Sequence, residues 1–318
     1  MLPAEPKIFH GRESELADIL NHFRESSPRI AILGAGGMGK TSLAQTVLHH
    51  KEIIIKYQGN RLFVPCVRNI RPEWRRAGGL GRTTTHLGIK PGKDLTRAVL
   101  RFLSEDSPTL LVLDNLETVW EPAESRKEVE EFLSLLTDIV SLALMITMRG
   151  AERPFKVQWT RPFLPPLKPL ARDAARKMFI DIAEDRHTMV EIDEVLDLTD
   201  NMPLSISLLA HAVDVEGTTA ILSRWQMEHT SVISEGYDLR SNLELSISLS
   251  LASPRITATP HSQELLSLLS ILPDGLSDVE LKQSNFAIQG ILDCKRALLR
   301  TALAYTDDHK RLKALVPI

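Results

Sequence analysis

The chain has 318 residues, of which 43% are hydrophobic and 25% charged, and its formal net charge is −3. This composition is typical of a globular protein of about two domains, and it excludes wholesale disorder and polyanion binding through overall charge alone. Cys66 and Cys294 give neither a disulfide framework nor a zinc-ligand spacing, which favours a reducing, cytoplasmic setting. Neither a secretion signal nor an apolar stretch of membrane-spanning length is evident, so we expect no membrane association.

Strand-like and helix-like segments alternate over the first 150 residues. The patterns predict helices over 12–25, 41–50 and 126–140, and strands over 29–33, 61–67, 110–113 and 142–146. The strand at 110–113 is entirely apolar, as expected for a strand buried on both faces of a sheet. Such alternation predicts an α/β fold with a parallel sheet sandwiched by helices.

A run of prolines marks a boundary in the chain: Pro162, Pro165, Pro166 and Pro169. Beyond it the pattern is almost entirely helical, until residues 302–306 and 311–316 predict a strand–turn–strand hairpin. Helices followed by a hairpin favour a winged-helix unit. We therefore expect an α/β core over 1–165, a helical lid over 166–236 and a winged-helix domain over 237–318, truncated at its end.

Residues 68–82 break the pattern where a helix is expected. They hold five arginines and three glycines, with no apolar period. Three explanations stay open: a solvated loop, an artefact of the gene model, and a nucleic-acid contact. The first is favoured, because basic loops are usually only solvated and Trp74 is the one aromatic residue among these arginines.

The segment from Gly34 to Thr41, GAGGMGKT, matches the phosphate-binding loop pattern G-x-x-x-x-G-K-[ST] and lies between a predicted strand and a predicted helix. Glycines let successive backbone N–H groups point at an anion, and the helix N-terminus adds its positive end. Lys40 is expected to contact the β- and γ-phosphates and the Thr41 hydroxyl to ligate Mg²⁺. A chance glycine-rich turn is the weak alternative. We expect these residues to bind the nucleotide: Gly34, Gly36, Gly37, Met38, Gly39, Lys40, Thr41 and Ser42.

Three charged residues stand at or just beyond the ends of predicted strands. Asp114 ends a buried strand, where a carboxylate needs a cation or hydrogen bonds, so we expect it to serve Mg²⁺ as in a Walker B strand; a turn or a helix cap is the alternative. Glu117 is a candidate for positioning the attacking water, although a surface carboxylate at a helix start is equally compatible. Arg149 is expected to contact the γ-phosphate, because ligands bind at the carboxyl ends of such strands; a surface arginine is the alternative.

Together these motifs resemble the STAND class of P-loop NTPases, the NB-ARC and NACHT-like signalling ATPases, most closely the fungal members. The similarity spans nearly the whole chain. Phe9-x-Gly11-Arg12-Glu13 resembles the N-terminal motif of that class, which implies that Gly11 and Arg12 lie beside the adenine. Residues 147–149 look like its sensor 1, and residues 202–204 like its G-x-P motif, which implies that Pro203 packs against the nucleotide. Pro273-Asp274-Gly275-Leu276 and the hairpin after it look like its winged helix.

The resemblance implies a signal-transduction switch that binds ATP or ADP with Mg²⁺ and controls conformation and assembly, with itself or with other proteins. Two residues depart from the pattern of the class. Asn201 replaces the usual glycine before Met202-Pro203, and Asn115 replaces the acidic residue that often follows the Walker B aspartate. Two possibilities for ATP hydrolysis stay open: that it is slow, or that it rests on Glu117.

Two other functions share some of these features. A DNA-handling AAA+-like ATPase also joins a P-loop core to a winged helix, but residues 237–318 carry 9 Lys/Arg and 9 Asp/Glu. A DNA-binding unit usually shows a basic stripe, so we expect no nucleic-acid partner. A metabolic kinase needs an acceptor site, and no base for one is evident.

Overall fold

The computed structural model describes residues 2–66, 95–104, 107–184, 186–228, 251, 254–272, 274–283, 286, 288–301, 303–307 and 309–314. The segment 68–82 lies outside the described residues, so its three explanations stay open. The chain forms two compact units. Unit 1 comprises Met1–Lys7, Glu13–Leu33 and Lys40–Pro166, and unit 2 comprises Ile8–Arg12, Gly34–Gly39 and Leu167–Ile318.

A parallel sheet of four strands, in the order β1-β4-β3-β2, forms the centre of unit 1. The strands are β1 (Arg29–Gly34), β2 (Arg61–Pro65), β3 (Thr109–Asp114) and β4 (Leu142–Arg149). β3 pairs in parallel with both β2 and β4. Every residue of β3 is buried, because helices cover both faces of the sheet. The predicted parallel sheet is therefore confirmed.

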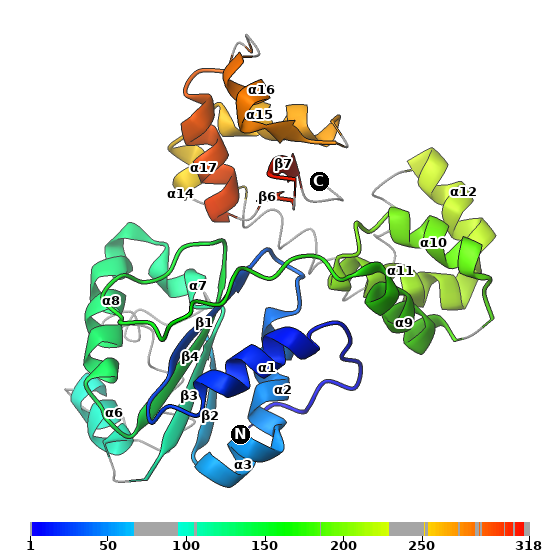
Figure 1. Cartoon of the computed structure of the whole chain (residues 1–318). Helices are drawn as coiled ribbons and strands as arrows, with labels where there is room; N and C mark the ends of the chain where they lie inside the picture. The colour runs from blue at the N-terminus through cyan, green and yellow to red at the C-terminus, as the bar shows by residue number, and fades with distance from the viewer. Residues whose placement is uncertain are drawn as a thin grey trace. The chain divides into compact units, whose positions relative to one another are not determined.

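Two helical layers enclose this sheet (Figure 1). One layer holds α1 (Glu13–His22), α2 (Lys40–His49) and α3 (Lys51–Tyr57), and the other holds α6 (Leu95–Leu103), α7 (Glu117–Trp120) and α8 (Ala123–Thr137). Side chains alternate along β3, so that Leu111 and Leu113 pack in one hydrophobic cluster with Val99 of α6 and Leu133 of α8. The helix predicted over 126–140 begins and ends three residues earlier, and α3 and α6 lie outside the helices that the sequence predicted.

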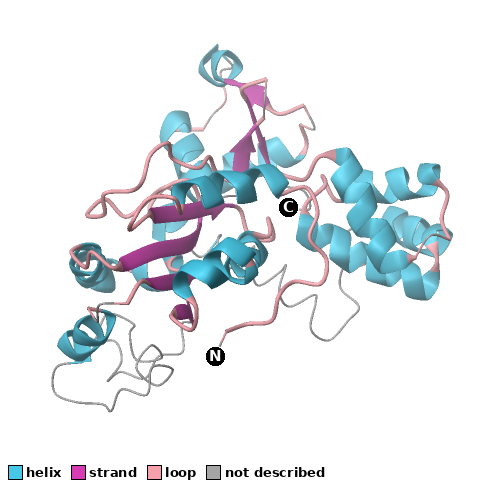
Figure 2. Cartoon of the chain, turned by 60° about the horizontal axis from the view of Figure 1, so that its bottom comes forward, coloured by secondary structure: helices cyan, strands magenta, loops and turns pink. Residues whose placement is uncertain are grey.

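The longest segment of unit 2, Leu167–Ile318, begins with four helices: α9 (Arg172–Ala183), α10 (Met189–Asp197), α11 (Pro203–Glu216) and α12 (Thr218–Glu228). Figure 2 shows this stretch as a cluster of helices. Pro203 is the first residue of α11, a position where its missing N–H is not needed. Arg176 joins α9 to α10 through a 2.8 Å ion pair with Asp193. The helical region predicted after the prolines is confirmed.

The last part of unit 2 combines short helices with a small antiparallel sheet. The helices are α14 (Pro254–Thr257), α15 (Ser262–Ser270), α16 (Asp278–Gln283) and α17 (Ile291–Thr301), and the sheet order is β5 (Leu276–Ser277), β7 (Arg311–Ala314), β6 (Ala304–Thr306). β6 and β7 are the predicted hairpin, paired antiparallel. This arrangement is consistent with the predicted winged helix. Among the helices that the structure describes, none is both long enough and apolar enough to cross a membrane.

Candidate functional site

The glycine-rich loop follows β1 and leads directly into α2, which begins at Lys40. Gly37 and Gly39 adopt φ angles of +77° and +81°. Residues with a side chain rarely adopt these angles, so the glycines at these positions are required by the backbone. This is the strand–loop–helix context in which backbone N–H groups can surround a phosphate, as the motif predicted.

Within unit 2, the loop packs against the start of α11. Gly37 accepts a 3.2 Å hydrogen bond from the backbone N–H of Leu204. A Cβ atom at Gly37 would lie only 2.9 Å from Leu204 Cβ and 3.3 Å from the sulfur of Met202. The segment holding Pro203 is therefore in direct contact with the glycine-rich loop.

The predicted N-terminal motif contacts the same part of unit 2. The Arg12 guanidinium is buried and donates to the carbonyl oxygens of Met38, at 3.2 Å, and Lys168. Gly11 has a φ of +69°, and a Cβ there would overlap Ala174 of α9. Gly11 and Arg12 thus join the glycine-rich loop to the beginning of the helical region, while their predicted contact with adenine stays a prediction.

Asn201 occupies a backbone conformation that explains why it can replace glycine. Its φ is +55°, a left-handed value that asparagine tolerates better than most residues. Its side-chain oxygen accepts from Arg172 Nη1 at 3.2 Å, and its backbone N–H donates to Thr199 Oγ1 at 3.1 Å. The substitution therefore preserves the turn before Met202.

Asp114 is the centre of a hydroxyl cluster at the carboxyl ends of the unit 1 strands. It is 3% exposed, and its Oδ1 accepts from Thr41 Oγ1 at 2.8 Å and from Thr147 Oγ1 at 2.6 Å. Asp114 does not cap α7, because the cap position is Leu116. The helix-cap alternative is therefore wrong, and the carboxylate lies beside the predicted magnesium ligand Thr41.

Thr147 is a part of this cluster to which the sequence assigned no role of its own. It is completely buried on β4, and its hydroxyl also accepts a 3.0 Å hydrogen bond from the backbone N–H of Asn115. A single hydroxyl within the otherwise apolar residues 142–148 was the available signal. Asn115 itself has a φ of +56°, a left-handed value that asparagine tolerates better than most residues.

Three charged side chains lie around this carboxylate. Lys40 is 6% exposed, and burial lowers its pKa from 10.5 to about 8, opposed by the negative charges of Glu117 and Asp114 and assisted by the positive charge of Arg149. Glu117 begins α7, as the alternative interpretation supposed, but it is buried, so the surface-carboxylate part of that alternative is wrong. Burial raises the pKa of Glu117, and the charges of Lys40 and Arg149 partly offset that rise.

Arg149 and Glu117 form an ion pair. Arg149 Nε lies 3.2 Å from Glu117 Oε1, and the backbone N–H of Arg149 donates to Oε2 at 3.3 Å. The Arg149 side chain is 20% exposed and ends β4, so the surface-loop alternative for this residue is also wrong. The structure therefore brings Lys40, Thr41, Asp114, Glu117 and Arg149 together within unit 1.

The family comparison agrees with these motifs. Residues 2–230 match the family described as "Novel STAND NTPase 1". The chain belongs to this family. The STAND class inferred from the motifs is thereby confirmed, and membership of the novel STAND NTPase 1 family implies nucleotide binding. The particular closeness to fungal NB-ARC members stays a prediction. No curated protein matches the chain significantly.

This STAND NTPase is similar to several solved structures, and the first two below share its fold. The Walker-type ATPase PABY2304 of Pyrococcus abyssi has a TM-score of 0.60 at 13% identity, covering 96% of this chain and 93% of that one. Cdc6p of Pyrobaculum aerophilum has a TM-score of 0.54 at 14% identity, covering 99% and 92%. A STAND protein with a tetratricopeptide repeat sensor, PH0952 of Pyrococcus horikoshii, has a TM-score of 0.46 at 16% identity; the match covers 99% of this chain but only 42% of that protein.

The residues of the STAND NTPase fit a nucleotide with a hard cation. Thr41 and Asp114 carry side-chain oxygens, the kind of ligand that Mg²⁺ prefers, and Mg²⁺ is usually held by one or two carboxylates together with the phosphates of the substrate. Among the described residues, no group of three or more His, Cys, Asp or Glu lies together as an all-protein metal site. The oxygens of Thr41 and Asp114 therefore suit a metal that arrives with phosphate.

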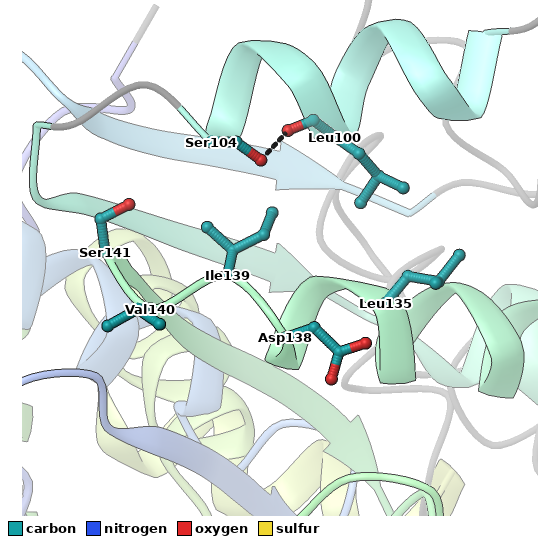
Figure 3. A pocket seen from close by; sticks show the side chains of 7 residues that line it. All are labelled: Leu100, Ser104, Leu135, Asp138, Ile139, Val140 and Ser141. Carbon is teal, nitrogen blue, oxygen red and sulfur yellow. Dashed lines mark hydrogen bonds between the residues drawn. The ribbon is translucent and has the colours of Figure 1, made fainter.

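A separate pocket of about 590 Å³ lies between the ends of α6 and α8 (Figure 3). Leu100 and Leu135 line it together with residues 138–141, which lead into the amino end of β4. Asp114 and Arg149 end β3 and β4 at the opposite edge of the sheet. The pocket is thus distinct from the cluster around Asp114.

Proposed function

We propose that this STAND NTPase is a nucleotide-operated switch, in which ATP or ADP bound at Gly34–Thr41 with Mg²⁺ controls conformation and assembly. The observation that carries this proposal is the carboxylate of Asp114, which accepts both the Thr41 and Thr147 hydroxyls at the carboxyl ends of the strands. A buried carboxylate beside a phosphate-loop threonine suits a phosphate-bound cation.

The contacts of the glycine-rich loop support the switching part of the proposal. A switch needs an element whose position differs between two ligand states. Gly37 contacts Leu204 and Met202 of the helical region directly. In this proposal, phosphates that reposition Gly37 also act on the start of α11, whose first residue is Pro203.

A second contact extends this connection to the C-terminal hairpin. Tyr305 of β6 donates a 2.8 Å hydrogen bond to Asp200, which lies two residues before Met202. We propose that residues 166–236 act as a lid and residues 237–318 as a winged helix, both responding to the nucleotide.

We assign separate roles to the charged residues around the nucleotide. Lys40 neutralises the phosphates, Thr41 and Asp114 hold Mg²⁺, and Arg149 contacts the third phosphate of ATP. Hydrolysis, where it occurs, is slow, because Asn115 stands where an acidic residue would otherwise follow Asp114. The partners are then further copies of the protein or other proteins.

Two measurements test the proposed function. The nucleotide carried by the purified protein is identified after denaturation, and the affinity for ADP is measured by calorimetry. The mass of the protein is then measured by light scattering with ADP and with a non-hydrolysable ATP analogue. We expect bound adenine nucleotide and a larger assembly with the analogue; equal masses contradict the switch, and absence of any nucleotide binding contradicts the site.

The alternative of a DNA-handling ATPase predicts a different result. The likeness to Cdc6p, at 14% identity, concerns the fold alone. The equal numbers of basic and acidic residues over 237–318 give this segment no excess positive charge for a duplex. Salt-dependent binding of double-stranded DNA by the protein would revive this alternative.

A further inference from the structure

The Glu117–Arg149 pair occupies both oxygens of the Glu117 carboxylate. Oε1 lies 3.2 Å from Arg149 Nε in an ion pair, and Oε2 accepts from the Arg149 backbone N–H at 3.3 Å. The Glu117 side chain is 9% exposed. A buried carboxylate requires hydrogen bonds or a positive partner, and Arg149 supplies both, so Arg149 stabilises Glu117 in this arrangement as much as Glu117 orients Arg149.

The two residues come from elements whose relative position is fixed. Arg149 is the last residue of β4 and Glu117 the first residue of α7. The turn between Asp114 and α7 is fastened to β4, because the N–H of Leu116 donates to the carbonyl oxygen of Thr147 at 3.0 Å. The ion pair therefore joins a strand end and a turn that are already hydrogen-bonded to each other. It is not an incidental contact of two long surface side chains.

Each edge of the Arg149 guanidinium group can bind only one anionic group at a time. Carboxylate and phosphate are both bound by the same N–H donors of arginine. An anion that binds the Nε edge of Arg149 therefore competes with the carboxylate of Glu117.

We propose that Glu117 is the resting counter-ion of Arg149, and that Arg149 exchanges this carboxylate for the third phosphate when a nucleoside triphosphate binds. This inference rests on the proposed function, because it assumes that a nucleotide occupies Gly34–Thr41. Glu117 then sets the preference between triphosphate and diphosphate, since a diphosphate has no third phosphate to reach Arg149. The same exchange releases the Glu117 carboxylate from Arg149. Glu117 is then available to contact water only when the third phosphate is bound.

The proposal assigns Glu117 a positioning and specificity role that equilibrium binding can measure. In the variant Glu117→Gln, the carboxylate charge is lost but an oxygen acceptor for Arg149 remains. We expect the ratio of affinities for a non-hydrolysable ATP analogue and for ADP to rise about tenfold, within the usual range of coupling between two sites. ADP affinity itself is expected to change less than threefold. No hydrolysis is involved in either measurement.

Two further variants separate this role from a structural one. Arg149→Gln removes the group for which carboxylate and phosphate compete, so the analogue-to-ADP ratio is expected to fall, and adding Glu117→Gln to it is expected to change nothing further. Glu130→Gln is the matched control, because Glu130 is also a buried glutamate of unit 1, 2% exposed, but hydrogen-bonds Trp120 Nε1 at 2.7 Å. Its ratio is expected to equal that of the wild type.

The outcomes distinguish this inference from the proposed function. If the wild type binds neither ADP nor the analogue, the proposed function fails. If the wild type binds both, an unchanged ratio in folded Glu117→Gln overturns the inference alone. Should Glu117→Gln not fold, Arg149→Gln decides by itself, since an unchanged ratio there also overturns the exchange.

Discussion

Thr147 donates its hydroxyl hydrogen to Asp114 Oδ1 across 2.6 Å, from a position on β4 with no exposed surface. The register of the sheet explains this meeting, because Leu113 is paired with Ile146 on the neighbouring strand. Asp114 and Thr147 are the next residues of these two strands, so they lie side by side at the carboxyl ends of β3 and β4. Thr41 contributes a second hydroxyl to the same oxygen, so the carboxylate is oriented before any cation binds.

Replacing Thr147 by valine tests this orientation. The side-chain shape is kept, but Asp114 loses a donor and the N–H of Asn115 loses its acceptor. We expect the free energy of unfolding to fall by about 1–3 kcal/mol, the usual cost of leaving buried polar groups without partners. Chemical denaturation measures this change. Thr147→Ser keeps the hydroxyl and is expected to lose less; equal losses in both variants contradict the hydrogen-bonding role.

Replacing Lys40 by alanine tests the phosphate-binding loop. Lys40 is buried and its pKa is lowered to about 8, so its charge is unfavourable in the folded protein without a ligand. We expect ADP affinity to fall by roughly 10- to 100-fold, as for loss of a charge-assisted hydrogen bond, with no loss of stability. Calorimetry and thermal denaturation measure the two effects. The exposed Lys51 provides the control variant Lys51→Ala, and unchanged ADP binding in Lys40→Ala refutes the assignment of the loop.

Replacing Asp114 by asparagine tests the magnesium assignment. The amide keeps an oxygen that can accept from Thr41 and Thr147, but it removes the negative charge that favours a cation. We expect nucleotide affinity to fall about tenfold in Mg²⁺ and to change little in EDTA. Equal losses under the two conditions indicate that Asp114 has a structural role instead.

Much of unit 1 could be predicted from the sequence because its signals are local. The apolar strands at 110–113 and 142–146 each lie within a few residues, and so does the pattern Gly34–Thr41, whose last two residues belong to unit 1. The pairing of Glu117 with Arg149 could not be predicted, because it depends on β3 and β4 being neighbours and on the direction of α7. Likewise, the left-handed backbone at Asn201 is set by its place between α10 and α11 and is not evident from its neighbours in the sequence.

Gly37 and Gly39 form a matched pair for testing the contact with the helical region. Both have positive φ angles, so alanine is strained at either position. At Gly37 the added Cβ also lies 2.9 Å from Leu204 Cβ, whereas at Gly39 it meets no atom within 4 Å. We expect Gly37→Ala to lower the melting temperature more than Gly39→Ala. Equal shifts in thermal denaturation indicate that only backbone strain is involved and that the contact with Leu204 contributes nothing.

The hydrogen bond from Tyr305 to Asp200 predicts a pH-dependent effect on stability. Burial raises the pKa of Asp200, and the Tyr305 hydroxyl and the charge of Lys313 partly offset this rise by favouring the carboxylate form. A carboxyl group with a raised pKa in the folded state binds protons more tightly there than in the unfolded chain. Its contribution to stability is therefore largest at low pH and falls as the pH rises from the normal aspartate range through the raised pKa.

Replacing Tyr305 by phenylalanine removes the donor that stabilises the ionised form of Asp200. The loss in unfolding free energy is expected to be about 1 kcal/mol at pH 7 and smaller near pH 4, where Asp200 is more often protonated and needs the donor less. Chemical denaturation at the two pH values measures the difference. In the background Asp200→Asn, which carries no charge at either pH, the effect of Tyr305→Phe is expected to be independent of pH. A loss that is the same at both pH values in the wild-type background shows that the ionised carboxylate of Asp200 is not what Tyr305 stabilises.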